Sequence, residues 1–78
     1  MATVVEVHGY AVRVFTRDHG NPHVHVFHRG SLMKIWLSPL AFDSHKGREP
    51  RQAEIARALQ VVAEHRAACL AKWIEIHA

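Results

Sequence analysis

The first half of the chain alternates between hydrophobic and polar residues, which is the pattern of β-strands with one buried face. Strands are predicted over residues 3–8, 11–17, 23–28 and 32–38. The connections between them are short and rich in glycine, asparagine and proline, so neighbouring strands are expected to run antiparallel. The pattern therefore predicts a four-stranded antiparallel β-meander over residues 1–38.

The second half of the chain is predicted to be mostly helical. The Ser38-Pro39 pair is typical of a helix start and predicts a short helical turn in the connecting segment 39–49. Apolar residues then recur at helical spacing, which predicts one long helix over residues 50–77. This apolar stripe is formed by Ile55, Leu59, Val62, Cys69, Leu70 and Trp73. The expected fold is a single α+β domain, residues 1–78, with the long helix packed on one face of the sheet.

The predicted helix is long for a domain of this size. It would span roughly 40 Å at 1.5 Å per residue, whereas a compact chain of 78 residues has a diameter of about 30 Å. Either the helix breaks or bends, or its end overhangs the sheet and packs against another chain. We favour the overhang, which predicts a homo-oligomer.

Composition narrows the class of protein without naming a function. The single cysteine, Cys69, excludes an intramolecular disulfide and cysteine-rich zinc modules, and it is expected to be a buried, inert thiol on the helix stripe. The longest apolar run, residues 67–71, is far shorter than the roughly 20 residues of a membrane span. We therefore expect a cytoplasmic protein without membrane contact. The net charge is +3, and the densest basic cluster, Lys46, Arg48 and Arg51, is compatible with nucleic acid binding.

One face of the predicted sheet should remain uncovered, because a single helix covers only the other. The alternation places aromatic, cationic and histidine side chains on this open face, a mixture that favours an interaction surface. The candidate partner-binding residues are Arg13, Phe15, His23, His25, Phe27, Lys34 and Trp36. Three interpretations stay open: docking of a protein or a second copy, stacking of single-stranded nucleic acid, or coverage by the segment containing Leu40 and Phe42.

The segment His23-Val24-His25 is the strongest candidate for chemistry. Alternate residues of a strand point the same way about 6.6 Å apart, so the two imidazoles can share a metal ion such as zinc. His8 or Glu6 would supply the third ligand. In an enzyme, His23 or His25 would act as general base on RNA. Without a fixed third ligand, a nucleophile elbow or a phosphate-binding loop, a protein without cofactor or catalysis is favoured.

Two segments of the chain resemble the small bacterial domain-of-unknown-function family 4160. These are Asp18-His19-Gly20-Asn21-Pro22-His23-Val24-His25-Val26 and the helix residues Glu64-His65-Arg66, Leu70 and Trp73. The similarity extends over nearly the whole chain, although Asn21 replaces the first of two prolines common in the family. By position, His19, Arg66 and Trp73 match the family motif without an assigned role. The resemblance implies a component of a toxin–antitoxin-like two-gene system, with a small protein partner encoded by a neighbouring gene.

The function expected from the sequence is therefore that of a small cytoplasmic protein-interaction module. It would bind a protein partner or itself through the open sheet face. The alternatives are an RNA-binding protein or histidine-dependent ribonuclease toxin, and a protein that binds metal through His23 and His25. Arg66 lies within the apolar stripe, so its stem either extends to water or reaches past the sheet edge to a carboxylate or a partner.

Overall fold

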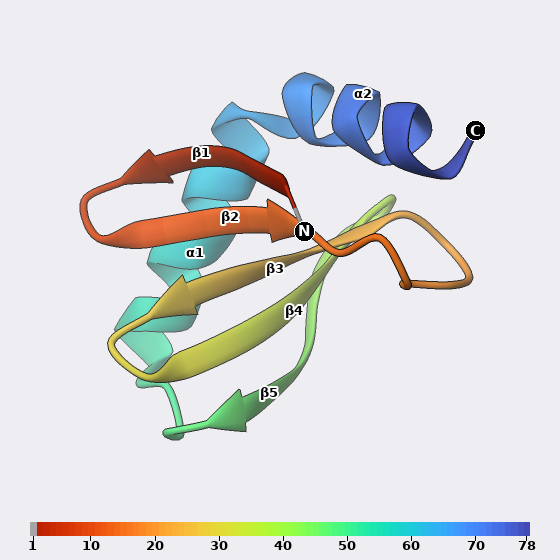
Figure 1. Cartoon of the computed structure of the whole chain (residues 1–78). Coiled ribbons are helices and arrows are strands. Elements are labelled where there is room, and N and C mark those ends of the chain that lie inside the picture. Colours follow the sequence, from red (N-terminus) through yellow and green to blue (C-terminus); the bar gives the residue numbers. More distant parts are fainter. Residues whose placement is uncertain (1) are drawn as a thin grey trace.

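The computed structural model describes residues 2–78 as a five-stranded sheet followed by two helices (Figure 1). The strands are β1 (Ala2–Val7), β2 (Tyr10–Val14), β3 (His23–His28), β4 (Ser31–Leu37) and β5 (Leu40–Gly47), and the helices are α1 (Gln52–Glu64) and α2 (Arg66–His77). Each strand pairs antiparallel with the next one along the chain. The predicted α+β class and antiparallel meander are confirmed, with one more strand and one more helix than expected.

Two tight hairpins bring separate parts of the chain to one end of the sheet. The β1–β2 loop is His8-Gly9 and the β3–β4 loop is Arg29-Gly30, and all four residues have positive φ angles. Two-residue loops with positive φ at both positions match the right-handed twist of the flanking strands. Both loops lie at the same end of the molecule (Figure 1), so the side chains of His8 and Arg29 belong to one region of the surface.

The segment after Pro39 is a strand, so the prediction of a helical turn over 39–49 is wrong. Ser38 and Pro39 form a turn, and β5 then pairs with β4 from Leu40 opposite Leu37 to Gly47 opposite Ser31. Strand pairing satisfies the backbone groups along the edge of β4, a gain that outweighs the local preference of a Ser-Pro pair for a helix start. Leu40 and Phe42 pack against the core and do not cover the open face.

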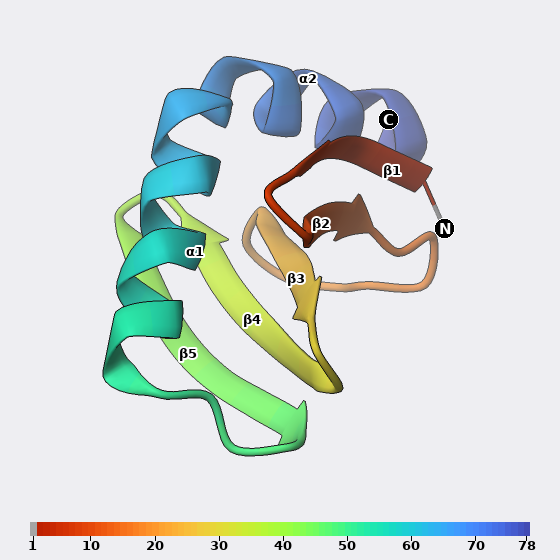
Figure 2. The ribbon, with the colours of Figure 1, turned by 90° about the vertical axis from the view of Figure 1, so that its left-hand side faces the viewer.

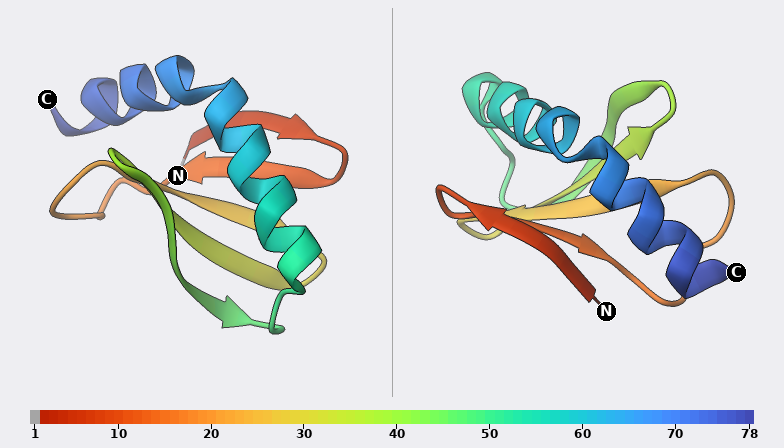
Figure 3. Two further views of the ribbon diagram at one scale, coloured as in Figure 1. Left: turned by 180° about the vertical axis from the view of Figure 1, so that it is seen from behind. Right: turned by 90° about the horizontal axis from the view of Figure 1, so that it is seen from above.

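The predicted long helix breaks at His65, which corrects both the single helix over 50–77 and the expected overhang. His65 has φ −119° and ψ 22°, and its Nδ1 donates a hydrogen bond to the carbonyl of Val61 at 2.9 Å. The break lets α1 cross the sheet and α2 run beside β1 (Figures 2 and 3), so both stay in contact with strands. The molecule is 34 Å in its longest dimension. The homo-oligomer remains a prediction, without the support of an overhanging helix.

The hydrophobic core fills the space between the sheet and the helices. The sheet contributes Val12, Val14, Val24, Val26, Met33, Ile35 and Leu37, and the helices contribute Ala58, Val61, Val62, Cys69 and Trp73. These core residues of β2 to β4 are all fully buried, whereas Val5 and Val7 of β1 are only partly buried. Burial raises the pKa of Cys69 to about 11, which keeps it a protonated thiol at neutral pH. Within residues 2–78, neither helix has the length and apolar character needed to cross a membrane.

Candidate functional site

Asp18, His23 and His25 converge at the start of β3, and we call these three residues the histidine cluster. Asp18 belongs to the turn before β3, while His23 and His25 are alternate residues of the strand. One carboxylate oxygen, Asp18 Oδ2, lies 3.2 Å from His23 Nε2 and 3.4 Å from His25 Nδ1. The structure thus brings the two histidines together, with Asp18 as the third member of the cluster.

His23 is buried, although its position in the strand predicted an exposed face. Its side chain lies between two tryptophans, with ring centroids 5.3 Å from Trp36 and 5.0 Å from Trp73, and it is 2% exposed. The loop before β3 lies at the same end of the molecule as the C-terminal half of α2 (Figures 1 and 3), which explains the contact with Trp73. The Nδ1 atom of His23 donates a hydrogen bond to the carbonyl of Asn21 at 2.9 Å.

His25 is half-buried at the wall of a cavity of about 340 Å³. Its ring stacks on Phe15 with centroids 4.4 Å apart. Burial lowers the pKa of His25, and the neighbouring Asp18 opposes this shift without cancelling it. Lys34 and Lys46 also line the cavity. The imidazole of His25 is therefore neutral at neutral pH and lies beside two ammonium groups. The histidine cluster is suited to bind a cation, and the two lysines are suited to bind an anion.

The remaining predicted partner-binding residues lie on the open face, where most of the aromatic rings already have partners. The Cζ atom of Arg13 lies 5.7 Å from the centroid of the Phe27 ring, and the Nζ atom of Lys34 lies 4.4 Å from that of the Trp36 ring. The indole nitrogen of Trp36 donates a hydrogen bond to Asp43 at 3.2 Å. Of the large apolar side chains on the described strands, Phe27 alone is exposed, at 40%. The open face therefore presents cations beside rings and has no broad apolar patch.

Neither predicted third ligand takes part in the histidine cluster. His8 lies in the β1–β2 loop and lines a different cavity, and Glu6 is an exposed residue of β1 opposite Ala11 on β2. His19 is exposed in the turn, next to Asp18 in sequence but outside the cluster. Asp18 was not predicted as a member of the cluster, because spacing along a strand does not indicate how the preceding turn folds back.

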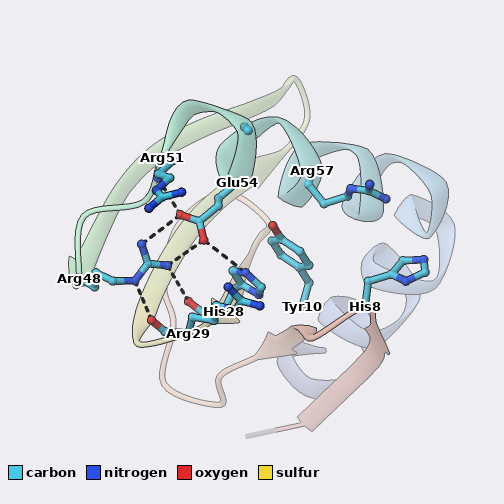
Figure 4. A pocket seen from close by; sticks show the side chains of 9 residues that line it. His8, Tyr10, His28, Arg29, Arg48, Arg51, Glu54 and Arg57 are labelled. Atoms are coloured by element: carbon cyan, nitrogen blue, oxygen red, sulfur yellow. Dashed lines mark hydrogen bonds and ion pairs between the residues drawn. The ribbon is translucent and has the colours of Figure 1, made fainter.

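A second cavity, of about 750 Å³, lies where the two hairpin loops meet the start of α1 (Figure 4). We call it the arginine pocket. It is lined by His8, Tyr10, His28, Arg29, Arg48, Arg51, Ala53, Glu54 and Arg57. Four arginines and a single carboxylate line the pocket, so it is strongly cationic.

Glu54 organises the arginine pocket. Its two oxygens accept hydrogen bonds from Arg48 Nη1 and Nη2 at 3.0 and 2.9 Å, and Oε1 also accepts the backbone N–H of Arg51 at 2.8 Å. Its Oε2 lies 3.3 Å from His28 Nε2, and His28 stacks on Tyr10 with centroids 3.8 Å apart. The Arg48 hydrogen bonds, followed by that from Arg51, lower the pKa of Glu54 to about 2. The carboxylate is therefore fully engaged with Arg48, Arg51 and His28.

The network around Glu54 predicts a specific loss of stability in acid. Because the pKa of Glu54 is lowered from 4.5 to about 2 in the folded protein, its stabilising effect is complete above pH 4.5 and is lost as the pH falls towards 2. In urea unfolding between pH 5 and 2, Glu54→Gln should flatten the decline in stability seen for the natural protein. Glu64→Gln, at an exposed position on the same helix, is the control and should leave the decline unchanged. If the free energy of unfolding declines equally steeply with falling pH in the natural protein and in Glu54→Gln, this prediction is wrong.

Sequence reasoning identified only part of the arginine pocket. Arg48 and Arg51 belong to the basic cluster noted above, but Tyr10 and His28 were missed because they are far from this cluster in the sequence, and Arg57 was not singled out on its helix. The motif residue Arg66 is outside both cavities. Its Nε donates a hydrogen bond to the carbonyl of Leu37 at 2.7 Å, so it binds the end of β4 and not a carboxylate.

Residues 9–74 match the model of a family described as a domain of unknown function (DUF4160). No curated protein and no solved structure shows significant similarity to the chain. The matched segment contains the whole histidine cluster and every residue of the arginine pocket except His8. The resemblance noted in the sequence is thus confirmed.

Proposed function

This chain belongs to the DUF4160 family, whose function is unknown, and we propose from its own side chains that it binds single-stranded nucleic acid. The observation that carries the proposal is the distribution of cations. Six of the ten lysine and arginine side chains line the arginine pocket or the cavity beside the histidine cluster. A polyanion that contacts several of them gains affinity through the release of counterions.

The two basic cavities contain little opposing charge. Their linings include only two carboxylates, Glu54 and Asp18, and both already contact cationic or imidazole groups. Lys46 lines one cavity and Arg48 the other, two residues apart in the chain. A strand of nucleic acid a few nucleotides long is therefore able to contact both surfaces.

The open face favours single strands over a duplex. Exposed Phe27, with Arg13 over its ring, offers a flat surface on which a base can stack. Stacking of bases on aromatic rings between cationic side chains is the common way in which antiparallel sheets bind single strands. Such stacking contributes about 1–3 kcal/mol per base and depends little on sequence.

Binding of a protein partner stays a second prediction. Among the described strand residues, Phe27 is the one large apolar side chain that is exposed, and a docking face for a protein normally offers more. Co-expression with the product of the neighbouring gene, followed by co-purification, would test it. A tight complex that survives Phe27→Ala with Trp36→Ala would exclude the open face as the interface.

The nucleic acid proposal is tested by fluorescence anisotropy with labelled RNA and DNA strands of one sequence at several salt concentrations. If the five cations that are free of ion pairs contact phosphates, log affinity should fall with log salt with a slope of about −3.5. These five are Arg29, Lys34, Lys46, Arg51 and Arg57. Absence of binding to either strand at low salt would contradict the proposal, and gel analysis of the bound RNA shows whether it is also cleaved.

Arg57→Gln and Lys72→Gln form a matched pair for this test. Both remove one positive charge from a helix, but Arg57 lines the arginine pocket whereas Lys72 pairs with Glu75 on α2. Arg57→Gln should reduce the salt slope by about 0.7 and weaken binding several-fold, because one phosphate contact is lost. Lys72→Gln should leave both values close to those of the natural protein. Equal effects of the two variants would mean that net charge, and not the arginine pocket, attracts the strand.

A further inference from the structure

We infer that the histidine cluster is a binding site for a divalent transition metal ion, zinc in the first place, with Asp18, His23 and His25 as ligands. This inference does not depend on nucleic acid binding, because its three ligands are not among the residues expected to contact phosphates. It is carried by the separations of the ligand atoms, by the hydrogen bonding of the two imidazoles and by the cavity next to them.

The separations of the ligand atoms fit tetrahedral coordination. Zinc bonds of about 2.0–2.1 Å at tetrahedral angles place neighbouring ligand atoms about 3.3–3.4 Å apart. The observed separations from Asp18 Oδ2 are 3.2 Å to His23 Nε2 and 3.4 Å to His25 Nδ1. All three ligand atoms lie within 4.8 Å of one another, so a small rotation of one imidazole closes the remaining pair.

The hydrogen bond of His23 determines which of its nitrogens is free. Since the Asn21 carbonyl can only accept, Nδ1 of His23 donates to it, and Nε2 is the ring nitrogen that faces the carboxylate. Metal-binding histidines are commonly fixed in this way, with the second ring nitrogen donating to a backbone carbonyl. A metal ion between Nε2 and the carboxylate fits this arrangement.

The other two ligand atoms are buried without hydrogen bonds. Asp18 Oδ2 and His25 Nδ1 have no hydrogen-bond partner among residues 2–78, and their side chains are only 17% and 14% exposed. A simple ion pair with a protonated imidazole would draw the atoms to about 2.7–2.9 Å, the length of charge-assisted hydrogen bonds. The observed separations of 3.2 and 3.4 Å are longer than this and match those between the ligand atoms of a tetrahedral zinc ion.

Three protein ligands leave one tetrahedral position open towards the cavity. A structural zinc site has four protein ligands, whereas a site with three binds water or a small ligand in the fourth position. Lys34 and Lys46 line the cavity at this point, and their charge favours a fourth ligand with an anionic oxygen. The chemical class of ligand expected there is a carboxylate or phosphate, or water in its absence.

Metal-free protein without a histidine tag, titrated with zinc chloride in a calorimeter, tests the inference. One equivalent of zinc should bind and raise the melting temperature, and cobalt in place of zinc should give the intense visible absorption of tetrahedral coordination. Less than a tenth of an equivalent of bound zinc would overturn the inference.

Variants separate the histidine cluster from the other histidines. Asp18→Asn and His25→Ala should each weaken zinc binding by more than about 10-fold, the loss caused by removing even an outer partner of a metal site. Their melting temperatures in the absence of metal show that they fold, and zinc should no longer raise these. His8→Ala is the control, because His8 lines the arginine pocket, and it should bind zinc normally. If His8→Ala weakens zinc binding as much as His25→Ala does, surface histidines bind the ion and the inference is wrong.

Discussion

Replacing Trp73 with alanine is expected to lower the free energy of unfolding by about 3–5 kcal/mol, the usual cost of removing a buried tryptophan side chain. Trp73 is 7% exposed and belongs to the core between α2 and the sheet. The centroid of its ring lies 5.0 Å from that of His23 and 3.9 Å from that of His77, on which it stacks. Because domains of this size have stabilities near the lower end of the 5–15 kcal/mol range, Trp73→Ala should bring the domain close to unfolding.

Urea unfolding followed by circular dichroism measures this effect, with Ile74→Ala as the control. Ile74 is the next residue of α2 but is 61% exposed, so its substitution should change stability by less than about 0.5 kcal/mol. Trp73→Phe keeps an aromatic ring beside His23 and should fold with a smaller loss. Similar losses for Trp73→Ala and Ile74→Ala would mean that α2 does not pack on the sheet as described.

The effect of Trp73 should extend to the histidine cluster, which distinguishes a positioning role from a purely structural one. His23 is held between Trp36 and Trp73 and by its bond to Asn21. In Trp73→Phe at a temperature where the protein is folded, zinc affinity should fall, because the imidazole gains freedom of rotation. Ile74→Ala should bind zinc as the natural protein does.

The strands of the first half were predictable because their alternation reflects burial on one face. Val12, Val14, Val24 and Val26 are all fully buried, as the period of two requires. The strand β5 was not predictable from local pattern, since five consecutive residues, 43–47, are exposed and polar or glycine. Its existence depends on the unpaired edge of β4, which is a property of the whole sheet.

The break at His65 was hidden by the continuity of the apolar stripe. Residues on both sides of His65 keep helical spacing, so a straight helix satisfies the same pattern. The predicted helix was longer than the expected diameter of the domain, but this mismatch did not distinguish a break in the helix from an overhanging end. In the structure the helix breaks, and Val62 before the break and Cys69 after it are both fully buried.

The two candidate sites differ in how far the sequence could predict them. His23 and His25 lie two apart on one strand, so their pairing follows from local geometry. The arginine pocket joins two hairpin loops to the start of α1, segments that are separated by up to about 50 residues. Only the register of the sheet brings them together, and no local pattern contains that information.

Replacing Gly47 with alanine is the second substitution with a large expected effect, about 2–4 kcal/mol of destabilisation. Gly47 has φ +80°, and adding a Cβ in such a left-handed conformation costs about 1–2 kcal/mol. The new Cβ would also meet the carbonyl oxygen of Gly30. That oxygen is backbone and accepts a hydrogen bond from the N–H of Arg48 at 3.0 Å, so no side-chain rotation relieves the contact.

Gly20→Ala separates the two contributions. Gly20 also has a positive φ, +87°, but a Cβ there meets no atom within 4 Å, so this variant shows the backbone cost alone. Gly47→Ala should therefore be less stable than Gly20→Ala by at least about 1 kcal/mol in urea unfolding. Because the strain falls on the β3–β4 loop and on Arg48, it should also disturb the hydrogen bonds from Arg48 to Glu54. If the two alanine variants lose equal stability, β5 does not approach the β3–β4 loop as described, and the arginine pocket would lack the contact that holds Arg48 in place.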